Sequence, residues 1–273
     1  MPCCWDALSA RLIERAGFGL TFMSGFAVSA ARLGAPDTQL ISYGEMVDQG
    51  RSLCSAVSLP VIGDADTGYG NALNVRRTVA GYAAAGFACA MIEDQVAPKR
   101  CGHTRGKAVV PRAEAVARIR AAVDEREAGQ DILVMARTDA ISTLGLEEAI
   151  ARGRAFRDAC ADIVFVEAPG SRDALARIGR ALEGTPLMAN LVEGGETPLL
   201  AHAELRALGF KIAAYPLTLI EVATRAIETA LAQMAAGSHP PEESRISFEY
   251  LREIVGFPAY HAAEARYAAE DEA

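Results

Sequence analysis

The chain has 273 residues, of which 51% are hydrophobic and 23% are charged, and its formal net charge is −8. This composition predicts a folded globular protein with a sizeable core, built either as one large barrel-type domain or as two ordinary domains. The negative net charge argues against an electrostatic nucleic-acid surface, although a local basic site for an anionic substrate is compatible with it.

Six cysteines are scattered along the chain, with neither the C-x-x-C pairs of zinc sites nor the density of a secreted disulfide scaffold. Reduced thiols in a cytoplasm fit this pattern best. Residues 1–6 show no charged region followed by an apolar stretch, and no apolar run reaches the length that spans a bilayer. We therefore expect a soluble cytoplasmic protein with no membrane partner.

The first predicted element is a helix at 6–17, which has apolar residues at helical spacing and ends on Gly17. A short strand at 20–23 follows and breaks at Ser24-Gly25. Strand-like runs then recur at 60–63, 88–92, 132–136, 163–166, 186–189 and 211–214, each followed by a polar loop and a longer helical segment. If residues 2–4 are a clipped first strand, the count is eight.

Short apolar runs separated by helices predict parallel strands that are buried on both faces. Eight such units predict an α/β fold, a TIM-type (α/β)8 barrel whose active site follows the C-terminal ends of the strands. Polar side chains stand at these positions: Ser24, Asp64, Asp66, Glu93, Arg137, Glu167 and Asn190. A doubly wound open sheet would show the same alternation, but the chain lacks a G-x-G-x-x-G turn.

The barrel is predicted to occupy residues 1–237, because 238–244 break the alternating pattern. A terminal helix is predicted from Arg245 to Tyr260, and its apolar face must bury against something. That face comprises Ile246, Phe248, Leu251, Ile254 and Val255. We expect residues 238–273 to form a helical extension that packs on a neighbouring subunit.

Two carboxylates, Asp64 and Asp66, precede a glycine-rich turn, and Glu93 ends the next strand. Carboxylates that converge at the mouth of a barrel repel one another unless a cation or a proton intervenes. A hard divalent ion such as Mg²⁺ meets that requirement. The alternative is that these acids cap the N-termini of helices, where Asp is common.

The loop after Glu93 carries a lysine, an arginine, a thiol and a histidine between Lys99 and His103, which is typical of a functional loop. Cationic neighbours make thiol chemistry or proton transfer possible at Cys101. The alternative is that this cysteine is a small core filler, although its loop position suits that role poorly. The other cysteines are interpreted as core fillers.

Arg137 ends an apolar strand, where a guanidinium is costly unless it meets an anion. A substrate carboxylate would serve as that anion. Asp139 or Glu167 would serve equally well in a structural ion pair.

Several motifs extend over nearly the whole chain: S-G (24–25), G-A-P-D (34–37), D-A-D-T-G-Y-G-N (64–71), E-D-Q (93–95), P-K-R-C-G-H (98–103), A-R-T-D-A (136–140), V-E-A-P (166–169) and N-L-V-E-G-G-E-T-P (190–198). In combination they resemble the isocitrate lyase / phosphoenolpyruvate mutase superfamily. The resemblance implies an (α/β)8 barrel whose last helix is exchanged with a neighbouring subunit, usually in a homotetramer that is a dimer of dimers.

The resemblance also implies a metal ion, Mg²⁺ with Mn²⁺ as a possible substitute. Asp64 would be the direct protein ligand, while Asp37, Asp66 and Glu93 would act through metal-bound waters. Such a thinly ligated, water-rich site suits Mg²⁺ chemically.

Within this superfamily, K-x-C-G-H is typical of lyases that cleave a carbon–carbon bond in a 2-hydroxy acid, whereas the mutases and some decarboxylases lack the cysteine. By similarity, Cys101 is the general acid, and Lys99 helps to order the loop. The 2-oxo acid half of the product would meet Mg²⁺, Arg137 and the backbone near Ser24 and Gly25. The other half would meet Gly102, His103, Glu167 and Asn190.

The branch is indicated by H-T-R-G-K (103–107) and N-L-V-E-G-G (190–195), which look more like 2,3-dimethylmalate lyase and the petal-death-like oxaloacetate hydrolases than like 2-methylisocitrate lyases. The hydrolases typically have a serine where this chain has Pro216, which cannot donate a side-chain hydrogen bond to a hydrated substrate. Phe26 replaces the glycine of methylisocitrate lyases and takes up room near the bound 2-oxo acid.

We therefore expect a Mg²⁺-dependent lyase that releases pyruvate and a second carboxylic acid from a 2,3-dimethylmalate- or 2-methylisocitrate-like acid. One alternative is an oxaloacetate hydrolase or decarboxylase on the same scaffold. An alternative of another class is a non-catalytic barrel that binds a dicarboxylate, and such a protein would tolerate the loss of Asp64 or Cys101. The residue that takes the hydroxyl proton is not indicated by the sequence.

Overall fold

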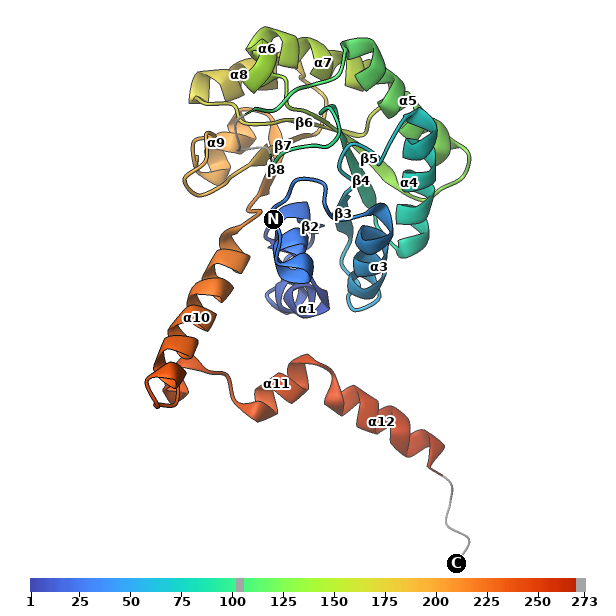
Figure 1. The fold of residues 1–273 in the computed structure, drawn as a ribbon. Helices are drawn as coiled ribbons and strands as arrows, with labels where there is room; N and C mark the ends of the chain where they lie inside the picture. The colour runs from blue at the N-terminus through green and yellow to red at the C-terminus, as the bar shows by residue number, and fades with distance from the viewer. Residues whose placement is uncertain (102–105, 269–273) are drawn as a thin grey trace, which may run out of the picture. The chain divides into compact units, whose positions relative to one another are not determined.

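The computed structural model describes residues 1–101 and 106–268. Eight parallel strands form one sheet in sequence order (Figure 1). They are β1 Cys3–Cys4, β2 Thr21–Met23, β3 Val61–Asp64, β4 Cys89–Glu93, β5 Leu133–Thr138, β6 Ile163–Val166, β7 Leu187–Asn190 and β8 Phe210–Ala214. All eight predicted strands are confirmed, and the sequential order excludes the doubly wound alternative, in which the strand order reverses.

The first and last strands meet through their main chains. Pro2 and Tyr215 form a parallel bridge, and the Cys3 N–H donates to the Tyr215 carbonyl at 3.2 Å. The Tyr215 N–H donates to the Met1 carbonyl at 2.9 Å. These contacts nearly close the sheet into a TIM-like barrel, which leaves little exposed strand edge.

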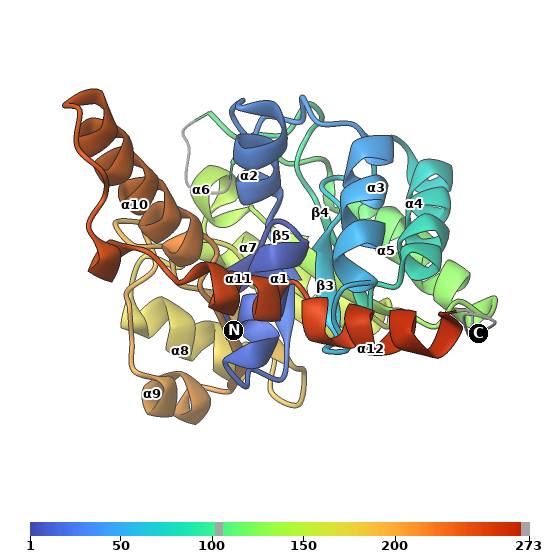
Figure 2. The same ribbon diagram turned by 90° about the horizontal axis from the view of Figure 1, so that it is seen from below.

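The helices that follow the strands are α1 Ala7–Arg15, α2 Gly25–Val28, α3 Tyr43–Cys54, α4 Ala72–Ala85, α5 Arg112–Glu127, α6 Ile141–Leu144, α7 Leu146–Asp158, α8 Arg172–Ala181 and α9 His202–Ala207, with a π-helical turn at Ser29–Leu33. Asp6, Ser42 and Asn71 begin three of them with reciprocal capping boxes, which satisfy backbone N–H groups at the helix start. Figures 1 and 2 show α3, α4 and α5 side by side along one flank of the barrel.

The core has two parts. The larger cluster lies between the strands and the surrounding helices and includes Tyr82, Phe87 and Phe156. The smaller cluster contains every second side chain of several strands, among them Ile62, Met91, Met135, Phe165 and Met188. Such alternation places these side chains inside the barrel, which is a packed core rather than a pore.

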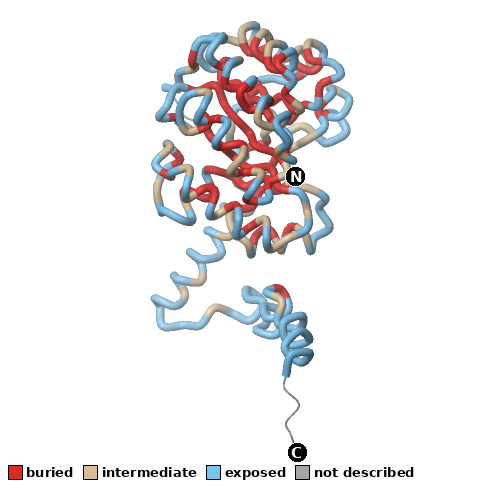
Figure 3. The backbone as a smooth tube through the Cα atoms, turned by 90° about the vertical axis from the view of Figure 1, so that its right-hand side faces the viewer, coloured by how far each residue is buried: buried red, intermediate tan, exposed pale blue. Residues whose placement is uncertain are grey.

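Residues Ile220–Ala273 form a second unit, distinct from Met1–Leu219. The second unit contains most of α10 (Thr218–Ala235), a 3-10 turn at Glu242–Ser244, α11 (Phe248–Ile254) and α12 (Phe257–Tyr267). The sequence placed the end of the barrel at 237. The first unit ends at Leu219, within the first turn of α10, and no residue of α10 is buried. Figure 3 shows buried residues concentrated in the first unit.

The prediction of one terminal helix at 245–260 is wrong. Gly256 adopts a left-handed φ of 94°, which ends α11, and α12 begins with Phe257 and Pro258. A glycine tolerates this conformation and a proline suits a first helical turn, so the chain breaks and restarts here. In the described part of the chain, no helix is both long enough and apolar enough to cross a membrane.

Candidate active site

The alternation of the strands explains which side chains reach the C-terminal end of the barrel. Along β4, the interior residue Met91 is followed two positions later by Glu93, and along β5 Met135 is followed by Arg137. Beyond β6, Phe165 is followed by Glu167, and in β7 Met188 is followed by Asn190. Because residues two apart face the same side of a strand, an apolar barrel interior leads directly to a polar end.

A cavity that is partly open to solvent lies at this end, with about 550 Å³ of empty space when its open mouth is included. Nine of the predicted site residues line it: Ser24, Phe26, Asp37, Asp64, Cys101, Arg137, Glu167, Asn190 and Pro216. Gly25, Asp66, Glu93 and Lys99 are buried and are not part of the described lining. The predicted residues Gly102 and His103 lie outside the described residues.

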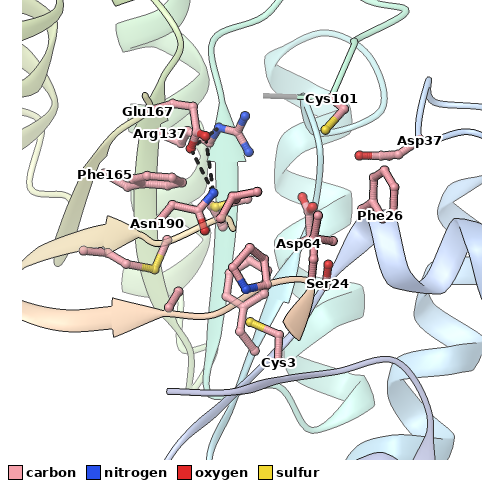
Figure 4. Close-up of a pocket in the computed structure, with 17 residues that line it drawn as sticks. Cys3, Ser24, Phe26, Asp37, Asp64, Cys101, Arg137, Phe165, Glu167 and Asn190 are labelled. Carbon is pink, nitrogen blue, oxygen red and sulfur yellow. Dashed lines mark hydrogen bonds and ion pairs between the residues drawn. The ribbon is translucent and has the colours of Figure 1, made fainter. Parts of the chain in front are cut away.

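The described lining has two chemically different sides (Figure 4). Cys101, Asp37 and Asp64 lie on one side together with Phe26. Arg137, Glu167 and Asn190 lie across the cavity, where the Asn190 amide donates to both Glu167 oxygens at 3.3 and 3.4 Å. A molecule in the cavity would therefore meet a thiol and carboxylates on one side and a guanidinium on the other.

Sequence reasoning missed the apolar part of the cavity, which comprises Cys3, Phe22, Met91, Phe165, Met188, Val192, Ala214 and Leu217. Most of these residues belong to strands and look like ordinary core positions in the sequence. Cys3 was interpreted as a core filler. It is buried in the interior cluster and also lines the cavity, and burial raises the pKa of its thiol.

An acidic cluster surrounds the ammonium of Lys99. The Lys99 Nζ lies 2.7 Å from Asp37 Oδ1 and 2.9 Å from Asp66 Oδ1. Burial by itself would lower the pKa of Lys99, but the carboxylates of Asp66, Asp64 and Asp37 outweigh burial and raise that pKa well above its ordinary value. The lysine therefore remains charged and neutralises part of the cluster.

Burial disfavours the charged form of two acids of the cluster, Asp66 and Glu93. Burial raises the pKa of Asp66 to about 6 against the opposing effect of Lys99. Burial also raises the pKa of Glu93 well above its ordinary value, although Arg137 acts in the opposite direction. Such shifts indicate that one ammonium does not satisfy all the carboxylates, and that a further cation would be favourable here.

The oxygens in this cluster fit a hard divalent ion. Among the residues that the structure describes, Asp66 Oδ2 and Glu93 Oε1 are buried without a hydrogen-bond partner. No three His, Cys, Asp or Glu side chains of the described ranges converge closely enough to bind a metal directly. The expected set does not require such convergence, because only Asp64 would bind directly. The helix-cap alternative does not explain Asp64 or Asp66, since the cap of α4 is Asn71.

Gly25 leaves room for the Asp64 carboxylate. A Cβ atom at this glycine would lie 2.5 Å from Asp64 Oδ2. Ser24 precedes it as the N-cap of α2, with its Oγ accepting the Ala27 N–H at 3.3 Å. The Asp64 carboxylate therefore leaves no room for a side chain at position 25.

Arg137 forms the structural ion pair with Asp139 that the sequence offered as an alternative to substrate binding. Its Nε and Nη2 donate to the two oxygens of Asp139 at 2.8 and 3.0 Å, and its Nη1 lies 3.3 Å from Glu93 Oε2. The same guanidinium lines the cavity and lies 5.3 Å from the centroid of the Phe165 ring. The structural ion pair thus holds the guanidinium at the cavity wall, and five N–H donors allow both roles.

The loop after β4 is tied at both ends, which the sequence did not indicate. The Gln95 side chain donates to the Arg100 carbonyl at 2.8 Å and accepts from the Arg100 N–H at 3.0 Å. Gln39 accepts from the Lys99 N–H at 3.1 Å. At the far end, the Val96 N–H donates to the Ala108 carbonyl at 2.8 Å. These contacts hold the loop on the cavity side that carries Cys101.

Comparison with known proteins extends this description. A family model described as phosphoenolpyruvate phosphomutase matches residues 1–235. The 2,3-dimethylmalate lyase of Eubacterium barkeri is 44% identical over 272 residues, which cover 98% of this chain and 92% of the relative. The chloroplastic carboxyvinyl-carboxyphosphonate phosphorylmutase of Arabidopsis thaliana is 42% identical, with coverages of 98% and 80%. The 2-methylisocitrate lyase of Salmonella typhimurium is 42% identical, with coverages of 82% and 75%.

Solved structures agree with the sequence matches. Oxaloacetate acetylhydrolase in complex with the inhibitor 3,3-difluorooxalacetate superposes with a TM-score of 0.94 at 36% identity, covering 99% of this chain and 92% of the other. A 2,3-dimethylmalate lyase superposes with a TM-score of 0.93 at 37% identity, covering 98% and 90%. Phosphonopyruvate hydrolase in complex with oxalate and Mg²⁺ reaches 0.86 at 33% identity, covering 97% and 93%.

The fold, the cavity and these matches agree with the resemblance found in the sequence motifs. Superfamily members bind Mg²⁺ and small carboxylic acids. The chain belongs to the PEP mutase/isocitrate lyase superfamily, and within it this chain is similar to carbon–carbon lyases of the 2,3-dimethylmalate and 2-methylisocitrate type.

Proposed function

We propose that this protein is a Mg²⁺-dependent lyase that cleaves an alkyl-substituted 2-hydroxy dicarboxylate, of which 2,3-dimethylmalate is the leading candidate by similarity, to pyruvate and a second carboxylic acid. The observation that carries the proposal is the cavity itself. It has the thiol of Cys101 on one side, the guanidinium of Arg137 on the other, and an apolar wall between them.

The metal would be held by Asp64 directly and by Asp37, Asp66 and Glu93 through waters, with Mn²⁺ as a possible substitute for Mg²⁺. When bound, the ion supplies stabilisation of the negative charge that develops on the oxygen of the future carbonyl group. Lys99 keeps the acids from repelling one another and holds the start of the loop against them.

The protein's own side chains would orient the substrate. Arg137 would bind a carboxylate of the 2-oxo acid half, with Ser24 on the opposite side of the cavity. The backbone near Ser24 and Gly25 would contact the same half. Glu167 and Asn190 are hydrogen-bonded to each other and would contact the other half. Gly102 and His103 are assigned to the same half from the sequence motif alone. Because Arg137 is fixed by Asp139 before any ligand binds, little conformational entropy remains to be lost on binding.

Cys101 is proposed as the general acid. Removal of the proton from the 2-hydroxyl group allows the bond to the next carbon to break, and the electron pair remains on that carbon and delocalises into its carboxylate. The thiol proton of Cys101 then transfers to this carbon and completes the second acid.

The lining favours a dicarboxylate over a tricarboxylate. Of the described residues that line the cavity, Arg137 alone carries a formal positive charge. A third carboxylate of a 2-methylisocitrate-like acid would face Phe165, Met188, Val192 or Leu217 and would lose its hydration without compensation. Alkyl groups would gain from the same contacts.

The assembly is part of the proposal. We infer a homotetramer, a dimer of dimers in which the C-terminal helices pack on a neighbouring subunit. Large apolar side chains exposed along one face of α10 support this inference, namely Ile227, Leu231 and Met234. An exposed apolar stripe of this extent on one helix is typical of an interface.

The decisive experiment measures pyruvate release from a panel that includes 2,3-dimethylmalate, 2-methylisocitrate and oxaloacetate, with Mg²⁺ and with EDTA. We expect 2,3-dimethylmalate to be cleaved, EDTA to abolish the activity, and Cys101→Ala to reduce kcat by about 10²-fold or more. Cys54→Ala is the matched control, because this helical cysteine lies outside the described lining. Undiminished turnover by Cys101→Ala would refute the mechanism.

A second candidate function is hydrolysis of oxaloacetate, because a structure of oxaloacetate acetylhydrolase superposes with a TM-score of 0.94. Pro216 lines the cavity at the position where these hydrolases typically carry a serine, and it offers no side-chain donor. We therefore expect no oxalate from oxaloacetate. Formation of oxalate at a rate that matches or exceeds the cleavage of 2,3-dimethylmalate would favour the hydrolase instead.

A further inference from the structure

Asp94 directly follows Glu93, the last residue of β4. It does not belong to the described lining of the cavity, so the proposed reaction gives it no role. It is 1% exposed, and both of its carboxylate oxygens are used within the protein. Oδ1 accepts the Asp139 N–H at 2.9 Å, and Oδ2 accepts the Thr138 hydroxyl at 2.6 Å. The carboxylate thus clamps the two residues at the end of β5.

The clamped residue Asp139 is the one that holds Arg137. It receives two hydrogen bonds from the guanidinium, as described above, and a third bond from Lys107 Nζ at 2.9 Å. Lys107 lies at the far end of the loop that carries Cys101. Asp139 therefore connects the guanidinium on one side of the cavity with the loop that reaches the other side.

Arg152 of α7 supports the clamp from behind. Its Nη1 donates to Asp94 Oδ2 at 2.9 Å, and its Nε donates to Glu148 Oε1 at 2.9 Å. Arg152 is 2% exposed, and Glu148 in turn pairs with Arg112 of α5. A continuous chain of charged groups therefore runs from the outer helices to the end of β5. Its members are Arg112, Glu148, Arg152 and Asp94.

We propose that Asp94 and Arg152 are positioning residues, which set the orientation of Arg137 through Asp139 without touching the substrate. The inference rests on the proposed function only in the role of Arg137 as the carboxylate-binding group. Its physical basis is geometric: a guanidinium binds a carboxylate through a planar fork, so a small rotation of Asp139 misdirects the donors that face the cavity.

A carboxylate is required at position 94. In Asp94→Asn, the amide oxygen can still accept the Asp139 N–H, but the amide NH₂ then faces the Arg152 guanidinium, which is also a donor, and the Thr138 hydroxyl loses its carboxylate acceptor. In Arg152→Met, the Asp94 charge remains buried without its cation. Both changes therefore weaken the hold on the end of β5 without replacing any side chain that lines the cavity.

The chain contains a matched control at the opposite end of the same strand. Asp162 Oδ2 accepts the Val134 N–H near the start of β5 at 2.8 Å and pairs with Arg126 Nη1 at 2.6 Å. This pair repeats the Asp–Arg clamp on β5 away from the cavity. Because the control pair is more exposed, both members are replaced together in Asp162→Asn/Arg126→Met.

The test measures binding of oxalate in the presence of Mg²⁺ by calorimetry, together with kcat, KM and Tm on 2,3-dimethylmalate. We expect Asp94→Asn and Arg152→Met to weaken oxalate binding and raise KM at least tenfold, and Arg152→Lys, which keeps one charged donor, to recover part of the loss. The double control variant should lower Tm and leave oxalate binding within twofold of the wild type.

Arg137→Met distinguishes a failure of the positioning role of Asp94 and Arg152 from a failure of the proposed carboxylate-binding role of Arg137. If it abolishes oxalate binding while Asp94→Asn and Arg152→Met bind normally, the positioning role is refuted and the proposed function stands. If Arg137→Met itself binds oxalate normally, the proposed role of Arg137 fails first. If Asp94→Asn does not fold, Thr138→Val serves as the second variant, because it removes one hydrogen bond to Asp94. Thr138→Val should raise KM more than it lowers kcat. An unchanged KM would overturn the proposal.

Discussion

At the scale of single residues, the absence of one side chain at Gly25 determines where the Asp64 carboxylate can lie. The backbone of Gly25 is not in the left-handed region, so alanine is allowed conformationally, and only the contact with Asp64 Oδ2 at 2.5 Å opposes it. This glycine is therefore required by the neighbouring carboxylate rather than by a turn.

We predict that Gly25→Ala weakens Mg²⁺ binding by about 10-fold or more, because it displaces the proposed direct ligand, and changes around metal ligands commonly have effects of this size. The measurement is a Mg²⁺ titration followed by calorimetry and by Tm. Gly19→Ala is the control, since nothing lies within 4 Å of its added Cβ, and it should leave Mg²⁺ binding unchanged. Equal Mg²⁺ affinity in both variants would contradict the assignment of Asp64.

At the scale of elements, β4 and β5 do more than supply single side chains. Each strand ends in a polar segment in which one residue faces the cavity region and the next faces the surrounding helices: Glu93 precedes Asp94, and Arg137 precedes Thr138. The loop after β4 then returns to the strand end, where the Val110 N–H donates to the Asp94 carbonyl at 2.9 Å. The geometry around Cys101 is therefore set by loop anchors as well as by the strand.

We predict that Gln95→Glu lowers kcat by about 10- to 100-fold, because one carboxylate oxygen would face the Arg100 carbonyl in place of a donated hydrogen bond, and a displacement of about 1 Å at a reacting group can cost that much. Steady-state kinetics on 2,3-dimethylmalate provide the measurement. Gln49→Glu is the control, because Gln49 also donates to a main-chain carbonyl, that of Trp5 at 2.8 Å, in another part of the barrel. A kcat equal to that of the control would show that the Gln95 tie is dispensable.

At the scale of the whole molecule, the two units differ in how they bury apolar surface. The first unit has the packed core of a barrel. In the described part of the second unit, Ile254 is the one apolar side chain that is buried. Met234, Ile246 and Phe248 are each more than half exposed. A chain that leaves this much apolar surface open on helices is expected to cover it by association.

We predict a solution mass of four times the 28.8 kDa of one chain, measured by light scattering coupled to size-exclusion chromatography. Leu231→Glu on α10 should reduce that mass, because it places a charge in the proposed interface. Leu73→Glu on α4, where the leucine is 73% exposed, should leave the mass unchanged. A monomer in the wild type would refute the proposed assembly.

The strands were predictable because the barrel is regular. Runs such as 163–166 are short, apolar and bounded by polar loops, and β6 has those same bounds. The break at Gly256 was missed because periodicity in this stretch fits one helix, and the left-handed φ that interrupts it is a property of the folded backbone. The helical pattern of α10 likewise does not show whether the helix packs within the chain, so the division at Leu219 can be seen only in the structure.

The sequence by itself determined the eight strands, the superfamily and the candidates Asp64, Cys101 and Arg137, because alternation along a strand and short chemical motifs are local properties. Only the tertiary structure decided what those residues face. The ion pairs of Lys99 with Asp37 and Asp66 and the hydrogen bond between Asp94 and the Asp139 N–H join residues that are far apart in sequence. Contacts of this kind depend on the closure of the barrel, which no single segment of the chain specifies.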